Sequence, residues 1–196
     1  MKILFISLGC DKNLADSEEM LGLLTGNGHE IVDSEEEADA IVINTCCFIH
    51  DAKEESVNTI LEMAEYKKTG TCKILIVTGC MAQRYKEEIT EEIPEVDAVL
   101  GTTSYGDIVK ALNEAEAGHV FQEFKDINAL PEDSGRRVIT TGGHFGYLKI
   151  AEGCDKHCTY CIIPSLRGKF RSVPEERLLK QAEYMASQGV RELILV

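Results

Sequence analysis

Three cysteines near the end of the chain have the residue type and spacing to hold an iron–sulfur cluster. Cys154, Cys158 and Cys161 form a CxxxCxxC pattern. Three thiolates can hold three irons of a four-iron cluster, which leaves the fourth iron open to an outside ligand and therefore to chemistry. A zinc site with a fourth ligand is the alternative, although His157 directly precedes Cys158 and the two side chains cannot easily point at one metal.

The composition predicts a folded chain from a reducing compartment. Of the 196 residues, 44% are hydrophobic and only four are proline, which is typical of a globular rather than a disordered chain. No apolar run approaches the ~20 residues that span a bilayer, and the first ten residues are expected to form a strand rather than a signal sequence. Eight cysteines without a secretory signal argue against structural disulfides and predict a cytoplasmic protein without a membrane partner.

Acidic and basic residues are distributed unevenly. The formal net charge is −14; residues 1–135 contain 10 Lys or Arg against 28 Asp or Glu, whereas residues 136–180 contain 9 against 4. An acidic surface repels nucleic acid. We therefore do not expect nucleic acid as a partner of this portion, and a basic protein is the better match.

The elements that must position these cysteines begin with apolar runs that alternate with helix-like segments. Near-continuous apolar strands between helices predict an α/β fold with a parallel sheet covered on both faces, and we expect a flavodoxin-like strand order of 2-1-3-4-5. The expected strands are 2–8, 29–33, 40–45, 73–78 and 98–101, and the expected helices are 16–26, 52–66, 81–92 and 105–116.

Two domains are expected. Residues 1–116 form the first, residues 117–139 lose the periodicity and are expected to be a linker, and residues 140–196 open a second unit. A single β-α-β unit cannot bury its own apolar faces, so this second domain is expected to be incomplete here. Its expected elements are a strand at 147–152, a long loop with the cysteine triplet, a helix at 174–188 and a strand at 192–196.

A second set of cysteines follows the expected strands. Cys10, Cys46 and Cys80 come after strands one, three and four, which are neighbours in the expected order. Because neighbouring strands lie ~4.8 Å apart, the three cysteines should converge at the sheet edge where open α/β sheets bind ligands. Cys47 does not fit this pattern because its side chain is expected to face the opposite way from that of Cys46. Cys72 does not fit because it lies at the start of its strand rather than at the end. The alternative is that buried cysteines act as small hydrophobic residues.

With both cysteine sets, the chain resembles the methylthiotransferases, a family of radical S-adenosylmethionine enzymes whose N-terminal domain binds a second cluster. The stretches SLGCDKNLADSE at 7–18 and IPSLRGKFRS at 163–172 resemble the branch that modifies a ribosomal protein. In that first stretch Asp11 stands where the branch commonly has proline. Asp16 or Ser17 is expected to cap the helix that follows.

The resemblance implies two 4Fe-4S clusters and the cofactor S-adenosylmethionine. It assigns the radical cluster to the CxxxCxxC triplet, and it places Tyr160, just before the third cysteine, near the adenine of the cofactor. Arg167 opens a basic patch and is expected to contact the cofactor, with a solvated loop as the alternative. A TIM-type barrel is implied to begin near residue 140 and to continue past residue 196. The implied ligands of the auxiliary cluster are Cys10, Cys46 and Cys80, and those of the radical cluster are Cys154, Cys158 and Cys161.

The implied reaction replaces a C–H bond by C–S–CH3 at the β-carbon of an aspartate in ribosomal protein S-twelve. Such a carbon has no readily removed proton, so acid–base groups cannot easily activate it, whereas a radical can. By the same resemblance, an electron donor of the flavodoxin or ferredoxin type is expected, and the sulfur donor is open. The alternatives are a tRNA adenosine methylthiotransferase and a non-catalytic iron–sulfur electron-transfer module.

Overall fold

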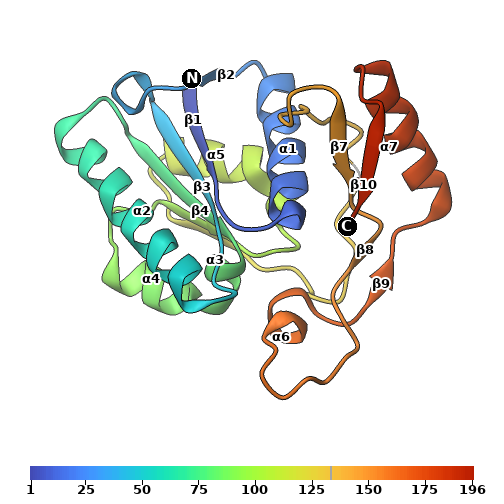
Figure 1. The fold of residues 1–196 in the computed structure, drawn as a ribbon. Helices are drawn as coiled ribbons and strands as arrows, with labels where there is room; N and C mark the ends of the chain where they lie inside the picture. Colours follow the sequence, from blue (N-terminus) through green and yellow to red (C-terminus); the bar gives the residue numbers. More distant parts are fainter. Residues whose placement is uncertain (133) are drawn as a thin grey trace.

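The computed structural model describes residues 1–132 and 134–196, and its larger part is a parallel sheet of six strands (Figure 1). The strands are β1 (Lys2–Ser7), β2 (Glu30–Val32), β3 (Ala40–Thr45), β4 (Ile74–Gly79), β5 (Ala98–Leu100) and β6 (Phe121–Glu123). Their order is β2-β1-β3-β4-β5-β6, which confirms the predicted α/β sheet. The sixth strand was not predicted: β6 lies within the stretch expected to be a linker and pairs with β5.

Helices cover both faces of this sheet. They are α1 (Asp11–Gly26), α2 (His50–Thr69), α3 (Cys80–Arg84), α4 (Lys86–Glu92) and α5 (Ile108–Glu116), with 3-10 turns η1 (Glu35–Glu37) and η2 (Tyr105–Asp107). Successive side chains of a strand point to opposite faces. Accordingly, Ile41 and Ile43 pack among residues of α2, α3 and α4, whereas Ala40 and Val42 pack among residues of α1 and α5. Burial on both faces explains why β3 reads as an uninterrupted apolar run.

The first helix begins earlier than predicted. Its first residue is Asp11 and its N-cap is Cys10 in an extended conformation, so the expectation that Asp16 or Ser17 caps it is wrong. Both residues lie inside α1 and are only 3% and 1% exposed. Asp16 meets Lys149 and Arg167 of the second unit, and the hydroxyl of Ser17 bonds to Ser7 and Asn44 at the ends of β1 and β3. A sequence pattern of period 3.6 does not reveal either set of contacts.

The second unit contains the predicted β-α-β arrangement. Its elements are β7 (Phe145–Leu148), β8 (Ala151–Glu152), α6 (Ile163–Arg167), β9 (Arg171–Ser172), α7 (Glu175–Ser187) and β10 (Glu192–Leu195). Strands β7 and β10 pair in parallel, β8 and β9 pair antiparallel, and Leu148, Met185 and Val190 form a small core. Helix α1 lies between the large sheet and this unit (Figure 1). Within the described residues, no helix has the length and apolar character to cross a bilayer.

Candidate functional site

The predicted convergence of three cysteines is found at the carboxyl ends of β1, β3 and β4. Cys10 caps α1, Cys46 directly follows β3, and Cys80 is the first residue of α3. All three line one cavity of about 1030 Å³. Strands β1, β3 and β4 are neighbours in the sheet, so the parallel topology alone brings together residues that are far apart in the sequence.

Two glycines make the turns before these cysteines possible. Gly9 and Gly79 have φ values of 95° and 94°, which side chains of L-residues rarely adopt. A side chain at Gly79 would lie 2.5 Å from the carbonyl oxygen of Thr45, and one at Gly9 would lie 2.7 Å from Cβ of Cys46. A Cβ at either position would therefore overlap a residue at the end of β3, so both positions need glycine.

Hydrogen bonds fix the loops that carry the thiols. The backbone N–H of Cys46 donates to Oγ of Ser56 at 3.0 Å, and the same hydroxyl donates to the Cys46 carbonyl at 2.7 Å. The side-chain amide of Asn13 donates to the carbonyls of Leu8 at 3.0 Å and Thr45 at 2.9 Å. Asn13 is fully buried, so it joins α1 to the ends of β1 and β3 without contact with water.

Burial sets the protonation of two of the thiols. It raises the pKa of Cys80 to about 12, although the guanidinium of Arg167 opposes this rise, and it raises the pKa of Cys47 to about 11. Cys47 donates from Sγ to the carbonyl of Cys80 at 3.3 Å and packs in the core, whereas Cys46 lines the cavity. This placement favours Cys46 over Cys47 as the middle ligand, which stays a prediction.

The CxxxCxxC triplet lies on the loop between β8 and α6. Cys158 is exposed, and Cys154 and Cys161 are half-buried. The backbone N–H of Cys161 donates to the carbonyl of Cys158 at 3.0 Å, which turns the loop, and Tyr160 is 91% exposed. Among the residues described, no three Cys, His, Asp or Glu side chains are gathered closely enough to hold a metal ion. Both cysteine assignments, and the place of Tyr160 near the cofactor, therefore stay predictions.

A buried network of four charges lies next to the cysteine cavity, and the sequence reading missed it. Lys149 pairs with Asp16 and, at 2.8 Å, with Glu152; Arg167 pairs with Asp16 at 2.9 Å and with Glu152 at 3.1 Å. Burial would raise the pKa of Glu152, but the two cations outweigh it and lower that pKa to about 2. Arg167 is only 4% exposed, so the solvated-loop alternative is wrong for it. Its contact with the cofactor stays a prediction.

A second buried ion pair joins α1 to the segment before β7. Arg137 donates to one carboxylate oxygen of Glu18 from Nε at 2.8 Å and from Nη2 at 2.6 Å, while Thr140 donates to the other from its backbone N–H at 2.7 Å. The sequence carried a signal for these pairs: α1 opens with a run of polar residues, and residues 136–180 are basic where the preceding part is acidic. Part of that charge contrast is satisfied inside the molecule.

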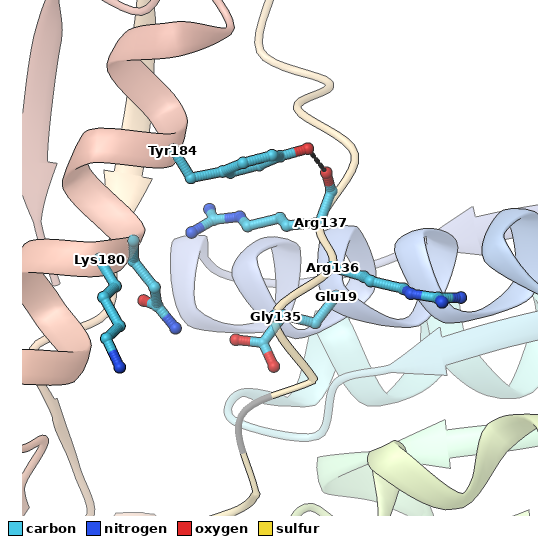
Figure 2. Close-up of a pocket in the computed structure, with 7 residues that line it drawn as sticks. Glu19, Gly135, Arg136, Arg137, Lys180 and Tyr184 are labelled. Atoms are coloured by element: carbon cyan, nitrogen blue, oxygen red, sulfur yellow. Dashed lines mark hydrogen bonds between the residues drawn. The ribbon is translucent and has the colours of Figure 1, made fainter.

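A smaller cavity of about 270 Å³ lies between α1 and α7 (Figure 2). The backbone at Arg137 crosses this cavity, and the carbonyl of Arg137 accepts a hydrogen bond of 2.5 Å from Oη of Tyr184. Glu19 lines the cavity from α1 and Lys180 from α7; burial raises the pKa of Glu19. None of the predicted cysteine ligands is among the described residues that line it, so this cavity belongs to the junction of the two units.

Two family models match the chain. The one described as "Uncharacterized protein family UPF0004" matches residues 2–101, and the one described as "Radical SAM superfamily" matches residues 148–196. The first covers strands β1 to β5 and the cavity cysteines, and the second begins at the end of β7 and includes the triplet. These matches, together with the relatives described next, confirm the resemblance of the chain to the methylthiotransferases.

Three curated relatives carry the same name, "Ribosomal protein uS12 methylthiotransferase RimO". The protein of Lachnoclostridium phytofermentans is 64% identical over 196 residues, which is all of this chain and 44% of the relative. That of Clostridioides difficile is 50% identical over 196 residues, and that of Acetivibrio thermocellus is 50% identical over 202 residues, with the same coverage of both chains. The chain thus spans less than half the length of these relatives.

Proposed function

We propose, from the fact that this chain belongs to the protein family UPF0004, that it is part of a radical S-adenosylmethionine methylthiotransferase acting on an aspartate of ribosomal protein uS12. The observation that carries the proposal is a pair of cysteine sets in one chain. Three thiols line one cavity at the sheet edge, and the CxxxCxxC loop starts beside Gly153, which lines the same cavity. The name of the relatives at 64% and 50% identity supports the substrate.

We assign the auxiliary cluster to residues 1–116 and the first β-α-β part of the radical domain to residues 140–196. The linker was expected at 117–139, and β6 takes up part of it because Phe121–Glu123 joins the large sheet. The sheet with its cavity and the second unit with its loop are thus separate carriers for two clusters. Catalysis by the whole enzyme requires the remaining length that the relatives have.

Each cysteine set supplies the three thiols that an open four-iron cluster needs, and the thiols of each set would have to move closer together to bind it. Cys10, Cys46 and Cys80 are free thiols around one cavity, and a set of three thiolates holds three irons of a four-iron cluster while one iron stays open. The high pKa of Cys80 means that this thiol keeps its proton without a metal. A coordinated metal removes the proton from such a thiol, so burial and metal binding are compatible here.

When bound, the clusters and S-adenosylmethionine supply the electron, the radical and the methylthio group that turn an unactivated C–H bond into C–S–CH3. The residues of this chain hold and orient these groups. Cys154, Cys158 and Cys161 hold the radical cluster, and Tyr160 is free on its loop to lie against the adenine. Arg167 lines the cavity and is the candidate for a contact with the cofactor.

The partners follow from the same chemistry. The cluster needs single electrons, so we propose a flavodoxin- or ferredoxin-type donor, and a separate sulfur donor must replace the sulfur that each turnover consumes. Eight free thiols fit a reducing compartment, and we place the enzyme in the cytoplasm. The acidic N-terminal part favours a basic protein over RNA as the substrate, because an RNA-binding surface is normally basic.

The test uses the full-length protein, reconstituted with iron and sulfide without oxygen and given S-adenosylmethionine and a reductant. Ribosomal protein uS12 and tRNA are both offered, and each is weighed by mass spectrometry. We expect a methylthio gain on uS12. A gain on tRNA would contradict the substrate and leave the chemistry standing, and no gain on either with intact clusters would favour an electron-transfer module.

Single cysteine variants divide the two roles. We expect Cys154→Ala to abolish cleavage of S-adenosylmethionine, and Cys80→Ala to keep cleavage while it loses methylthio transfer. Cys72→Ala is the matched control, because Cys72 is equally buried but donates to the carbonyl of Ile74 at 3.3 Å and does not line the cavity. Equal loss of cleavage in Cys154→Ala and Cys80→Ala would refute this division.

A further inference from the structure

The guanidinium of Arg167 connects three elements that belong to different parts of the chain. Its Nη1 donates to Asp16 of α1 at 2.9 Å and to Glu152 at the end of β8 at 3.1 Å. Its Nη2 donates to Oδ1 of Asn13 at 2.5 Å. Arg167 itself ends α6, the helix that follows the cysteine triplet. One buried side chain thus meets both the large sheet's first helix and the loop of the second unit.

The contact with Asn13 leads directly to the cavity cysteines. Asn13 ties the ends of β1 and β3 through Leu8 and Thr45, and its Oδ1 lies 3.7 Å from Sγ of Cys80. Cys10 is the N-cap residue of the same helix, and its backbone carbonyl accepts a hydrogen bond from the N–H of Leu14 at 3.0 Å. The acceptor that Arg167 uses is therefore part of the frame that holds the strand-end loops.

The other side of Arg167 leads to the triplet. Glu152 lies just ahead of Cys154 in the sequence, and the backbone N–H of Cys154 donates to the carbonyl of Gly168 at 3.1 Å. The beginning of the triplet loop is therefore bound to the residue next to Arg167. The start of this loop is thus held at Glu152 by the guanidinium itself and at Cys154 by the carbonyl of Gly168, and the loop ends in α6, whose last residue is Arg167.

We propose that Arg167 is a positioning residue that fixes the loop of Cys154, Cys158 and Cys161 against the sheet edge with Cys10, Cys46 and Cys80. This role follows from the contacts of Arg167, and its consequence for catalysis rests on the proposed function. Lysine cannot take this role, because the planar fork of arginine reaches several acceptors at once, whereas an ammonium is a compact point charge.

The test compares Arg167→Lys with Arg137→Lys in the full-length protein. Arg137 is the matched control: it is equally buried and pairs with Glu18 of the same helix, but it does not line the cysteine cavity. In protein freed of iron, the rate of alkylation of each thiol by iodoacetamide is followed by mass spectrometry. We expect Cys80 to react on the order of tenfold faster in Arg167→Lys, because loss of a charged contact opens its surroundings, and within about twofold of wild type in Arg137→Lys.

A second readout measures the geometry between the two cysteine sets. In the reconstituted protein, the magnetic interaction between two reduced clusters, seen by electron paramagnetic resonance, should change in Arg167→Lys and not in Arg137→Lys. Asn13→Ala serves if Arg167→Lys does not fold, and the same change in Cys80 alkylation is expected there. The proposal is overturned if the rate of Cys80 alkylation rises equally in both arginine variants. It is also overturned if that rate rises in neither Arg167→Lys nor Asn13→Ala. A protein that binds no iron would refute the proposed function, while the alkylation comparison would still decide the role of Arg167.

Discussion

Replacement of Glu18 by glutamine should loosen the segment that leads into β7. Glu18 is fully buried, and its two oxygens accept from Arg137 and from Thr140. Glutamine keeps the size of the side chain but removes the charge, and its NH2 group must face the donors of either Arg137 or Thr140 while Arg137 remains buried. Breaking a buried pair in this way costs about 3–5 kcal/mol. We expect local opening of this segment to become easier by that amount.

Hydrogen exchange followed by mass spectrometry measures this opening in the full-length protein. At about 1.4 kcal/mol for each factor of ten, the lower figure predicts that protection of amides in peptides from 137–148 falls on the order of 100-fold. Peptides from β3 should not change. Glu65→Gln is the control, because Glu65 pairs with Lys68 at an exposed position, where such pairs contribute ~1 kcal/mol or less. A loss of protection below about fivefold would refute the reasoning, since Arg137 would then not depend on this carboxylate.

Two further changes test the turn before Cys80 and the buried charge network. Gly79→Ala should lower the free energy of unfolding by about 3 kcal/mol or more, because the left-handed backbone costs roughly 1–2 kcal/mol and the new Cβ overlaps Thr45. Gly28→Ala is the control: Gly28 has a φ of 84° with open space around it, so this variant should lose only the backbone part. Equal losses of stability in the two variants would contradict the close approach of Gly79 to Thr45. Since the folded pKa of Glu152 is about 2 and an unfolded glutamate titrates near 4.3, its contribution to stability is complete above about pH 4.3 and is lost as pH falls toward 2. Thermal melts should show that loss in wild type and a smaller one in Glu152→Gln; identical curves would contradict it.

The sequence was sufficient to predict strands β1 to β5 of the sheet and the meeting of three cysteines at its edge. Each apolar run is long enough to mark a buried strand, and in a parallel sheet the carboxyl ends of neighbouring strands must meet at one edge. Cys10, Cys46 and Cys80 follow from that rule without any knowledge of contacts. Local pattern and topology carry this information together.

What the sequence did not reveal depends on distant partners. The start of α1 is polar, and the side chains of Asp16 and Asn13 that it buries meet Arg167, which lies 151 and 154 residues away in the sequence. Strand β6 has only three residues, among them Gln122 and Glu123, and it lies at the edge of the sheet. An edge strand needs little apolar surface, so its signal is weak.

The long sequence separation of the buried pairs has a consequence for synthesis of the protein on the ribosome. Helix α1 emerges early, but the cations that neutralise Asp16 are Lys149 and Arg167, which lie 133 and 151 residues later. At translation rates of about 5–20 residues per second, the carboxylate of Asp16 waits roughly 7–30 s for its partners. Because that face of α1 is charged rather than apolar, it stays hydrated during the wait, whereas an apolar face of the same size would invite aggregation of the nascent chain.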